Sequence, residues 1–131
     1  MNPLHALARH GQAIWLDNID RRLLESGGLR RLVEDDGLRG VTSNPSIFQK
    51  AISTGVDYDK KISALLLANP GISTLELYEE LAVADIREAT DCLRPVWEQT
   101  RGEDGYVSLE VNPHLAHDTD GTVEEARRLW R

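Results

Sequence analysis

The chain has 131 residues, 40% of them hydrophobic, and a formal net charge of −7 at pH 7. This length suits one domain with its own core, and the scattered Lys and Arg lack the basic face that nucleic-acid binding needs. Cys92 is the only cysteine, which excludes an internal disulfide, and we expect it to serve in helix packing. The start has no apolar segment of signal-peptide length, and no apolar run approaches the ~20 residues of a membrane span. We therefore expect a cytoplasmic protein that binds neither nucleic acid nor membranes.

The first predicted strand is the apolar run AIWLD at residues 13–17, which ends in a carboxylate. A continuous apolar run of this length is typical of a strand that is buried on both faces. Leucines in helical spacing follow, interrupted by Gly27-Gly28 and ended by Gly37. This pattern predicts either one helix or two short ones.

The second predicted strand is RGVTS at residues 39–43. Asn44 is then well placed as the N-cap of a helix, and Pro45 as its first residue, where the missing N–H costs nothing. We expect this helix to run to about Ile52.

Most of the second half of the chain is predicted to be helical. Residues 57–68 form an amphipathic segment that Pro70-Gly71 breaks. Ser73 and Glu76 then make an S-x-x-E capping box at the start of one long helix. We expect that helix to be kinked or stopped near Pro95.

The third predicted strand is YVSLEV at residues 106–111, with Glu110 near its end, and a last helix begins near Thr122. Strands that alternate with helices usually lie parallel, because a parallel crossover needs a connection of a dozen or more residues. The chain is therefore expected to be a single α/β unit, residues 1–131, with no second domain.

Polar side chains follow each predicted strand: Asp17, then Thr42-Ser43-Asn44, then Glu110. In α/β barrels and open α/β sheets, active-site residues gather at the carboxyl ends of the strands. Simpler roles also fit: Asn44 as a plain cap, the two hydroxyls as partners of loop backbone, and Asp17 as the cap of a helix near residue 20. Glu110 inside an apolar strand would need a partner if it were buried. Their shared position on one rim makes an active site the sharper hypothesis.

Three segments of the chain resemble signature segments of the transaldolase family, in particular its longer bacterial type. They are IWLDNI at residues 14–19, GVTSNPSIF at 40–48 and VSLEVNPHLAHDT at 107–119. The resemblance extends from about Gly11 to Arg131, so the chain looks like the N-terminal part of such an enzyme. It implies a parallel (β/α)8 TIM barrel, of which only about the first three βα units are present in this chain.

The resemblance also implies an activity. Enzymes of this family transfer a dihydroxyacetone unit between sugar phosphates in the pentose phosphate pathway, from sedoheptulose 7-phosphate to glyceraldehyde 3-phosphate, without a metal or organic cofactor. A lysine forms a Schiff base with the donor ketone, and the iminium accepts electrons while the carbon–carbon bond breaks. By the match, Asp17 is the acid/base, and Glu110 acts through a water in Schiff-base formation and hydrolysis. Asn44 and Thr42 would bind the substrate, Thr42 in a supporting role.

The family's Schiff-base lysine has no counterpart among these 131 residues. In the family it lies on the strand that follows the helix beginning near Thr122. Lys50, Lys60 and Lys61 are the only lysines, and all three fall in predicted helices, where solvated surface positions are expected. Three strands also fall short of a closed barrel, which takes ~200 residues or more. We therefore expect little or no activity from this chain alone.

Other interpretations remain open at this stage. One is a different class I aldolase on the same barrel. Another is a non-catalytic fragment or interaction module that pairs with itself or with a complementary fragment through open sheet edges. A metal site at His114, His117 and Asp118 is disfavoured, because two His and one Asp in a turn are more often surface residues. The tryptophans at positions 15, 97 and 130 are expected to pack rather than to stack on a sugar.

Overall fold

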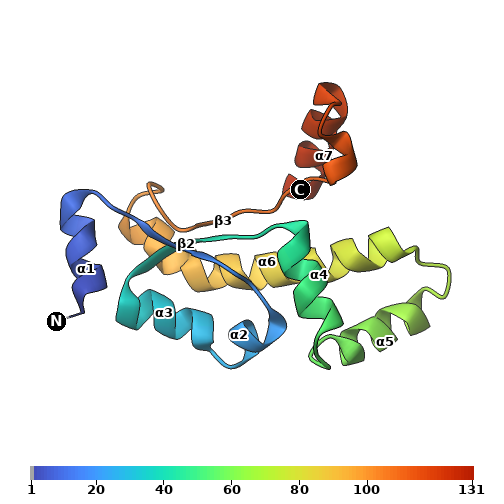
Figure 1. The fold of residues 1–131 in the computed structure, drawn as a ribbon, viewed down its shortest axis with the longest axis horizontal. Helices are drawn as coiled ribbons and strands as arrows, with labels where there is room; N and C mark the ends of the chain where they lie inside the picture. The colour runs from blue at the N-terminus through green and yellow to red at the C-terminus, as the bar shows by residue number, and fades with distance from the viewer. Residues whose placement is uncertain (1) are drawn as a thin grey trace.

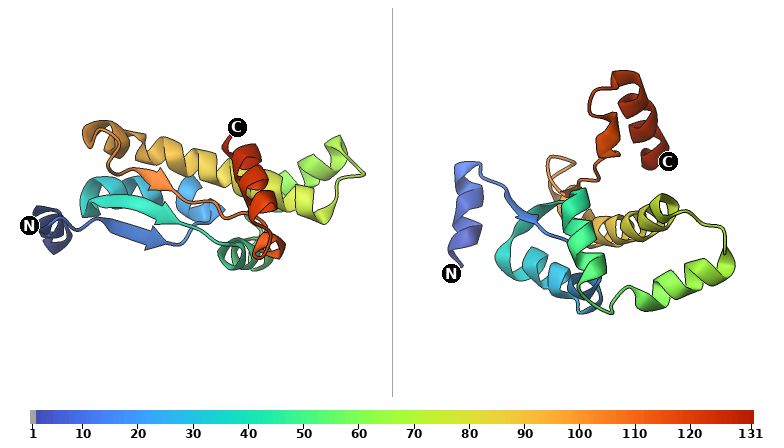
Figure 2. Two further views of the ribbon diagram at one scale, coloured as in Figure 1. Left: turned by 90° about the horizontal axis from the view of Figure 1, so that it is seen from above. Right: turned by 45° about the vertical axis from the view of Figure 1, so that its right-hand side comes forward.

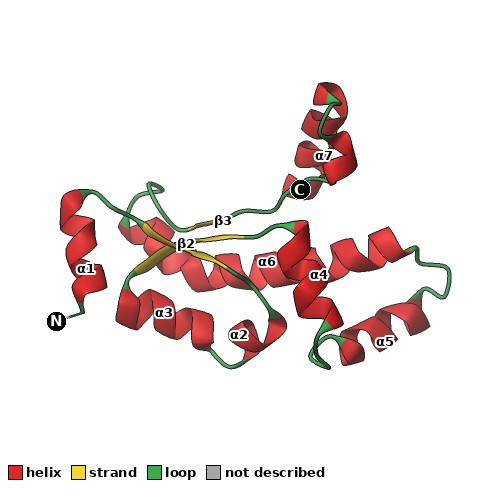
Figure 3. Ribbon diagram, in the orientation of Figure 1, coloured by secondary structure: helices red, strands yellow, loops and turns green. Residues whose placement is uncertain are grey.

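The computed structural model describes residues 2–131 and contains one sheet of three parallel strands in the order β1-β2-β3 (Figures 1 and 3). The elements are α1 (Pro3–Leu7), a 3-10 turn (Ala8–His10), β1 (Ile14–Asp17), α2 (Arg21–Glu25), α3 (Gly28–Asp36), β2 (Leu38–Thr42), α4 (Pro45–Ser53), α5 (Asp59–Ala68), α6 (Thr74–Gln99), β3 (Tyr106–Val107), a second 3-10 turn (Pro113–Leu115) and α7 (Thr119–Trp130). From β1 onward the predicted order of strands and helices is confirmed, whereas α1 and the 3-10 turn before β1 were not predicted. No helix within residues 2–131 combines the length and the apolar character that crossing a membrane requires.

The two faces of the sheet differ in what covers them. Helices α3 and α6 pack against β2, and α6 also contacts β3 (Figure 2). The core on this side includes Leu29 of α3, Val41 of β2, Phe48 of α4 and Leu93 of α6, none of which is exposed to solvent. Burial of these apolar side chains is the main force that holds the helices on the sheet.

The register of the strands sets which residues share the opposite face. Trp15 pairs with Gly40, Asp17 pairs with Thr42, and Gly40 also pairs with Tyr106. Because side chains alternate along a strand, Trp15 and Asp17 lie on one face and Leu16 on the other. Trp15 and Tyr106 are 41% and 45% exposed. The predicted burial of the first strand on both faces is therefore wrong: one face is open to solvent.

Several local predictions are confirmed. Asn44 caps α4 through a bond from the Ile47 N–H, with Pro45 as the first residue. The capping box of Ser73 and Glu76 is present at the start of α6. Cys92 packs, partly buried, against the core.

The region of Gly27 and Gly28 divides into two helices. Gly27 adopts φ 70°, a left-handed conformation that suits glycine and ends α2 before α3 begins. One of the two alternatives left open by the sequence is therefore correct.

Three local predictions differ from the structure. Helix α6 does not stop at Pro95 but continues to Gln99, since buried Leu93 and Val96 on either side of the proline hold that part of the helix against the core. The third strand is only two residues long, because Val107 pairs with Val41 and its partner β2 ends one residue later, at Thr42. The tryptophans pack less than expected: Trp130 is 89% exposed.

Candidate active site

Asp17 and Thr42 end two neighbouring strands and are joined by a hydrogen bond. They face each other in the β1–β2 register, and the Thr42 hydroxyl donates to Asp17 Oδ1 at 2.6 Å. The Asp17 side chain is otherwise exposed on the open face of the sheet. Thr42 thus restrains the carboxylate in a position that a ligand can reach.

Asp17 does not serve as a helix cap. That role belongs to Asp20, whose Oδ1 accepts the Leu23 N–H at 2.7 Å at the start of α2. The alternative that assigned the cap to Asp17 is therefore wrong, and the Asp17 carboxylate is not occupied by a capping bond.

Asn44 follows Thr42 by two residues and already has one structural duty. Its side-chain oxygen accepts the Ile47 N–H at 3.0 Å. An amide has an acceptor end and a donor end, so the cap leaves its NH2 group as the end available to a ligand. Asn44 therefore combines capping with an offered pair of hydrogen-bond donors.

Two serines fasten the end of β2 to the segment after β3. The buried Ser43 hydroxyl donates to the Ser108 carbonyl at 2.6 Å, and the Ser43 N–H donates to Ser108 Oγ at 3.0 Å. The Ser108 N–H in turn donates to the Val41 carbonyl at 2.9 Å. The prediction that Ser43 satisfies loop backbone is confirmed, since its partner Ser108 lies in the loop directly after β3. Ser108 was not identified from the sequence as the partner of Ser43. The only signal in the sequence is that each serine comes directly after a strand, Ser43 after β2 and Ser108 after β3.

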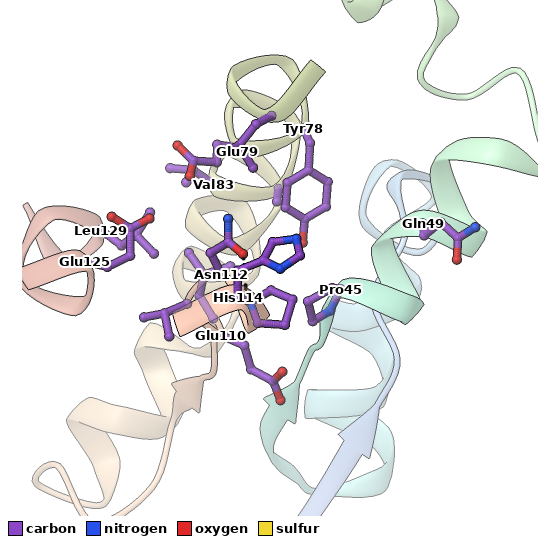
Figure 4. A pocket seen from close by; sticks show the side chains of 15 residues that line it. Pro45, Gln49, Tyr78, Glu79, Val83, Glu110, Asn112, His114, Glu125 and Leu129 are labelled. Carbon is purple, nitrogen blue, oxygen red and sulfur yellow. Dashed lines mark hydrogen bonds between the residues drawn. The ribbon is translucent and has the colours of Figure 1, made fainter. Parts of the chain in front are cut away.

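Glu110 lies three residues beyond the end of β3 and is exposed. The concern that a buried acid would need a partner therefore does not apply. It lines a pocket of about 310 Å³ together with Pro45 of α4 and residues of α6 and α7. In Figure 4 its carboxylate extends away from the rings of Tyr78 and His114. Glu110 thus lies beside the N-terminus of the helix that Asn44 caps.

The surroundings of the pocket carry negative charge. Burial raises the pKa of Tyr78, and the nearby carboxylates of Glu110 and Glu79 raise it further. Glu125 of α7 also lines the pocket, where Arg128 bonds to both Glu79 and Glu125. The phenol of Tyr78 is therefore neutral at physiological pH.

The remaining candidates lie apart from the strand ends. Lys50 and Lys60 are exposed on α4 and α5, as predicted. Lys61 on α5 differs, since it is partly buried and burial lowers its pKa. Within residues 2–131 no three His, Cys, Asp or Glu side chains are grouped as ligands for a metal ion. Asp118 instead caps α7.

The parallel strands, the helices on one face and the polar strand ends define an α/β protein of the kind that places its chemistry at the carboxyl edge of the sheet. Comparison with known proteins narrows this class. The family model for transaldolase/fructose-6-phosphate aldolase matches residues 14–131. The chain belongs to this family, and the resemblance seen in the three sequence segments is confirmed.

Curated relatives agree with the family match. Transaldolase 2 of Nostoc sp. is 50% identical over 131 residues, which is 100% of this chain and 34% of the relative. Transaldolase of Thiobacillus denitrificans is 49% identical over 130 residues, covering 99% of this chain and 36% of the relative. Transaldolase of Thermobifida fusca is 49% identical over 129 residues, covering 98% and 34%.

The extent of these matches explains the incomplete sheet. The chain spans about a third of the length of the curated relatives it matches. The family fold is a TIM barrel, and the three parallel strands with their helices are the partial set of βα units that was expected. The exposed face with Trp15, Asp17 and Tyr106 corresponds to the inside of such a barrel, because the helices cover the other face.

Proposed function

We propose that residues 1–131 form the N-terminal portion of a transaldolase, as one unit without a second domain, and that the whole enzyme acts on sugar phosphates. The observation that carries the proposal is the hydrogen-bonded pair of Asp17 and Thr42 at the ends of paired strands, in a chain of this family. The reaction is the transfer of a dihydroxyacetone unit from sedoheptulose 7-phosphate to glyceraldehyde 3-phosphate in the pentose phosphate pathway. The proposed location is the cytoplasm.

Asp17 would act as the acid/base of this reaction. A lysine supplied by another part of the barrel forms a Schiff base with the ketone of the donor sugar. Asp17 then takes the proton of the hydroxyl next to the breaking bond, the electrons of that carbon–carbon bond move to the iminium, and the aldose leaves as an aldehyde. The 2.6 Å bond from Thr42 supports this role, since it holds one carboxylate oxygen still.

Asn44 and Glu110 would handle the substrate and the water. The NH2 group of Asn44, left over from its capping bond, suits the oxygens of sugar hydroxyls. Glu110 is exposed beside the start of α4, where its carboxylate can bind the water that forms and hydrolyses the Schiff base. The proposed mechanism uses no metal or organic cofactor.

Borohydride trapping with fructose 6-phosphate, followed by intact mass, tests the nucleophile. Reduction converts a Schiff base into a stable adduct on lysine. We expect no adduct on the 131-residue chain, whose lysines lie on α4 and α5, and a stoichiometric adduct on a chain extended through the next strand. An adduct on Lys50, Lys60 or Lys61 would contradict the assignment.

The family description also includes an aldolase, which is the second candidate. Such an enzyme shares the Schiff base but releases free dihydroxyacetone without an acceptor aldose. Relatives that are about half identical and named transaldolase favour transfer. An acceptor-dependence assay on the extended chain separates the two: release of dihydroxyacetone at full rate without an aldose would favour the aldolase.

A non-catalytic association is the remaining proposal for the isolated chain. The ladder pairs β2 with β1 on one side and with β3 on the other, which leaves the outer edges of β1 and β3 unpaired within residues 2–131. Unpaired edges favour pairing with another chain, either a second copy or a complementary fragment. Size-exclusion chromatography with light scattering should show a discrete oligomer, and a clean monomer would count against self-association.

A further inference from the structure

A buried ionic cluster lies beneath the loop that follows Asp17. Asp85 of α6 has no solvent exposure, and its carboxylate is paired with the Arg21 guanidinium at the start of α2. The Tyr58 hydroxyl, just before α5, donates to Asp85 Oδ2 at 2.6 Å. Arg21 also reaches Glu88 Oε2 at 2.6 Å. The cluster therefore joins α2, α6 and the residue that precedes α5.

The cluster also holds the backbone of the loop. The Arg21 N–H donates to the Tyr58 hydroxyl at 3.1 Å, so this hydroxyl accepts from the loop and donates to the buried carboxylate. Only three residues separate Arg21 from Asp17, and the middle one, Ile19, is fully buried. Thr42 bonds to Asp17 from the neighbouring strand, and the cluster holds the chain at Arg21, just beyond Asp17 on its own strand's loop.

A role in stability alone explains the cluster poorly. Burying charges costs solvation energy that their attraction roughly repays, so a buried ion pair adds little stability over apolar residues of similar volume. Such a pair does fix the relative orientation of its groups, because charge-assisted hydrogen bonds require a specific geometry. Burial raises the pKa of Tyr58, so its hydroxyl keeps the proton that it donates.

We propose that Arg21, Tyr58 and Asp85 are positioning residues that set the placement of the Asp17 carboxylate through the loop between β1 and α2. The proposal rests on the proposed catalytic role of Asp17, but it concerns the geometry of this chain and needs no substrate for its test.

NMR spectroscopy of the isotope-labelled chain tests the proposal with Tyr58→Phe, which removes one hydroxyl and keeps the ring. We expect the Arg21 amide to exchange with solvent about fivefold faster, since it loses its acceptor. We also expect the 13C resonance of the Asp17 carboxyl to shift or broaden. The matched control is Tyr106→Phe, which also removes a hydroxyl that donates a bond, here to the Gly102 carbonyl at 2.5 Å. The control should leave the Arg21 amide and the Asp17 resonance unchanged.

Two results would overturn the proposal. One is an unchanged Asp17 resonance in folded Tyr58→Phe. The other is faster exchange by one common factor at every protected amide, which would mean a general loss of stability. If Tyr58→Phe does not fold, Glu88→Gln is the second variant, because it weakens the partly exposed ion pair between Arg21 and Glu88. This variant should also shift the Asp17 resonance, by less than the shift expected for Tyr58→Phe. No shift in that variant refutes the positioning role. A failure here leaves the result of borohydride trapping unaffected, so the two proposals fail separately.

Discussion

The indole of Trp15 lies across Gly40 on the open face of the sheet, and Gly40→Ala tests this contact. A Cβ added at Gly40 would lie 2.4 Å from Cδ2 and Cε2 of Trp15. Carbon atoms pack at about 3.5–4.0 Å, so the indole has to move by more than about 1 Å. Trp15 is 41% exposed, so it can swing outward, at the cost of part of its buried area. Losing about 60 Å² of apolar burial at ~25 cal/mol per Å² costs about 1.5 kcal/mol.

A double-mutant cycle isolates this effect. In a Trp15→Ala background the added methyl has room, so Gly40→Ala should stabilise the chain by about 0.5 kcal/mol through lower entropy of the unfolded state. The coupling between the two positions is then about 2 kcal/mol. Urea unfolding followed by far-UV circular dichroism measures it without relying on tryptophan fluorescence.

The matched control is Gly71→Ala. At this exposed glycine the nearest atom to an added Cβ is Asn69 Oδ1 at 3.7 Å, an ordinary contact, so we expect a change within about 0.5 kcal/mol. If Gly40→Ala costs the same free energy with Trp15 and with Ala at position 15, the indole does not rest on Gly40.

Four further predictions concern the helices around the sheet. Ser73→Ala should cost about 1 kcal/mol in urea unfolding, because it removes the cap of α6. Hydrogen bonds from Ser73 hold the pKa of Glu76 below its usual value. Their contribution to the free energy of unfolding is therefore present above the unfolded pKa of about 4.5 and is lost as the pH falls through the lower pKa of the folded state. Glu76→Gln should flatten this pH dependence of stability in the same urea assay. Burial raises the pKa of the Cys92 thiol, so at pH 7.5 iodoacetamide should react more slowly with Cys92 than with the thiol of free glutathione. The two rates should become equal in 6 M urea, and equal rates already in the absence of urea would contradict the burial of Cys92. Phe48→Ala should cost about 3–5 kcal/mol in the same unfolding assay, since the ring is fully buried and meets Tyr78 edge-on, and a cost below 1 kcal/mol would contradict its place in the core.

Local signals in the sequence were sufficient for most of the framework. The cap at Asn44, the capping box at Ser73 and the second strand, predicted at residues 39–43 and found at Leu38–Thr42, each depend on residues only a few positions apart. Such short-range patterns survive in any tertiary context, because the bonds they predict join neighbours in the chain. The length of β3 was overestimated since a strand is completed by its partners, which lie elsewhere in the sequence.

By itself, the sequence determined the alternation of strands and helices, their common carboxyl edge and the family to which the chain belongs. Only the tertiary structure decided how the side chains at that edge meet. Thr42 bonds to Asp17 across 25 positions, Ser43 to Ser108 across 65, and Arg21 to Asp85 across 64. Contacts at such separations depend on strand register and helix packing. The local sequence pattern around each residue does not predict either of these. Asp17 could be identified as a candidate from the sequence, whereas its hydrogen bond with Thr42 was identified only from the structure.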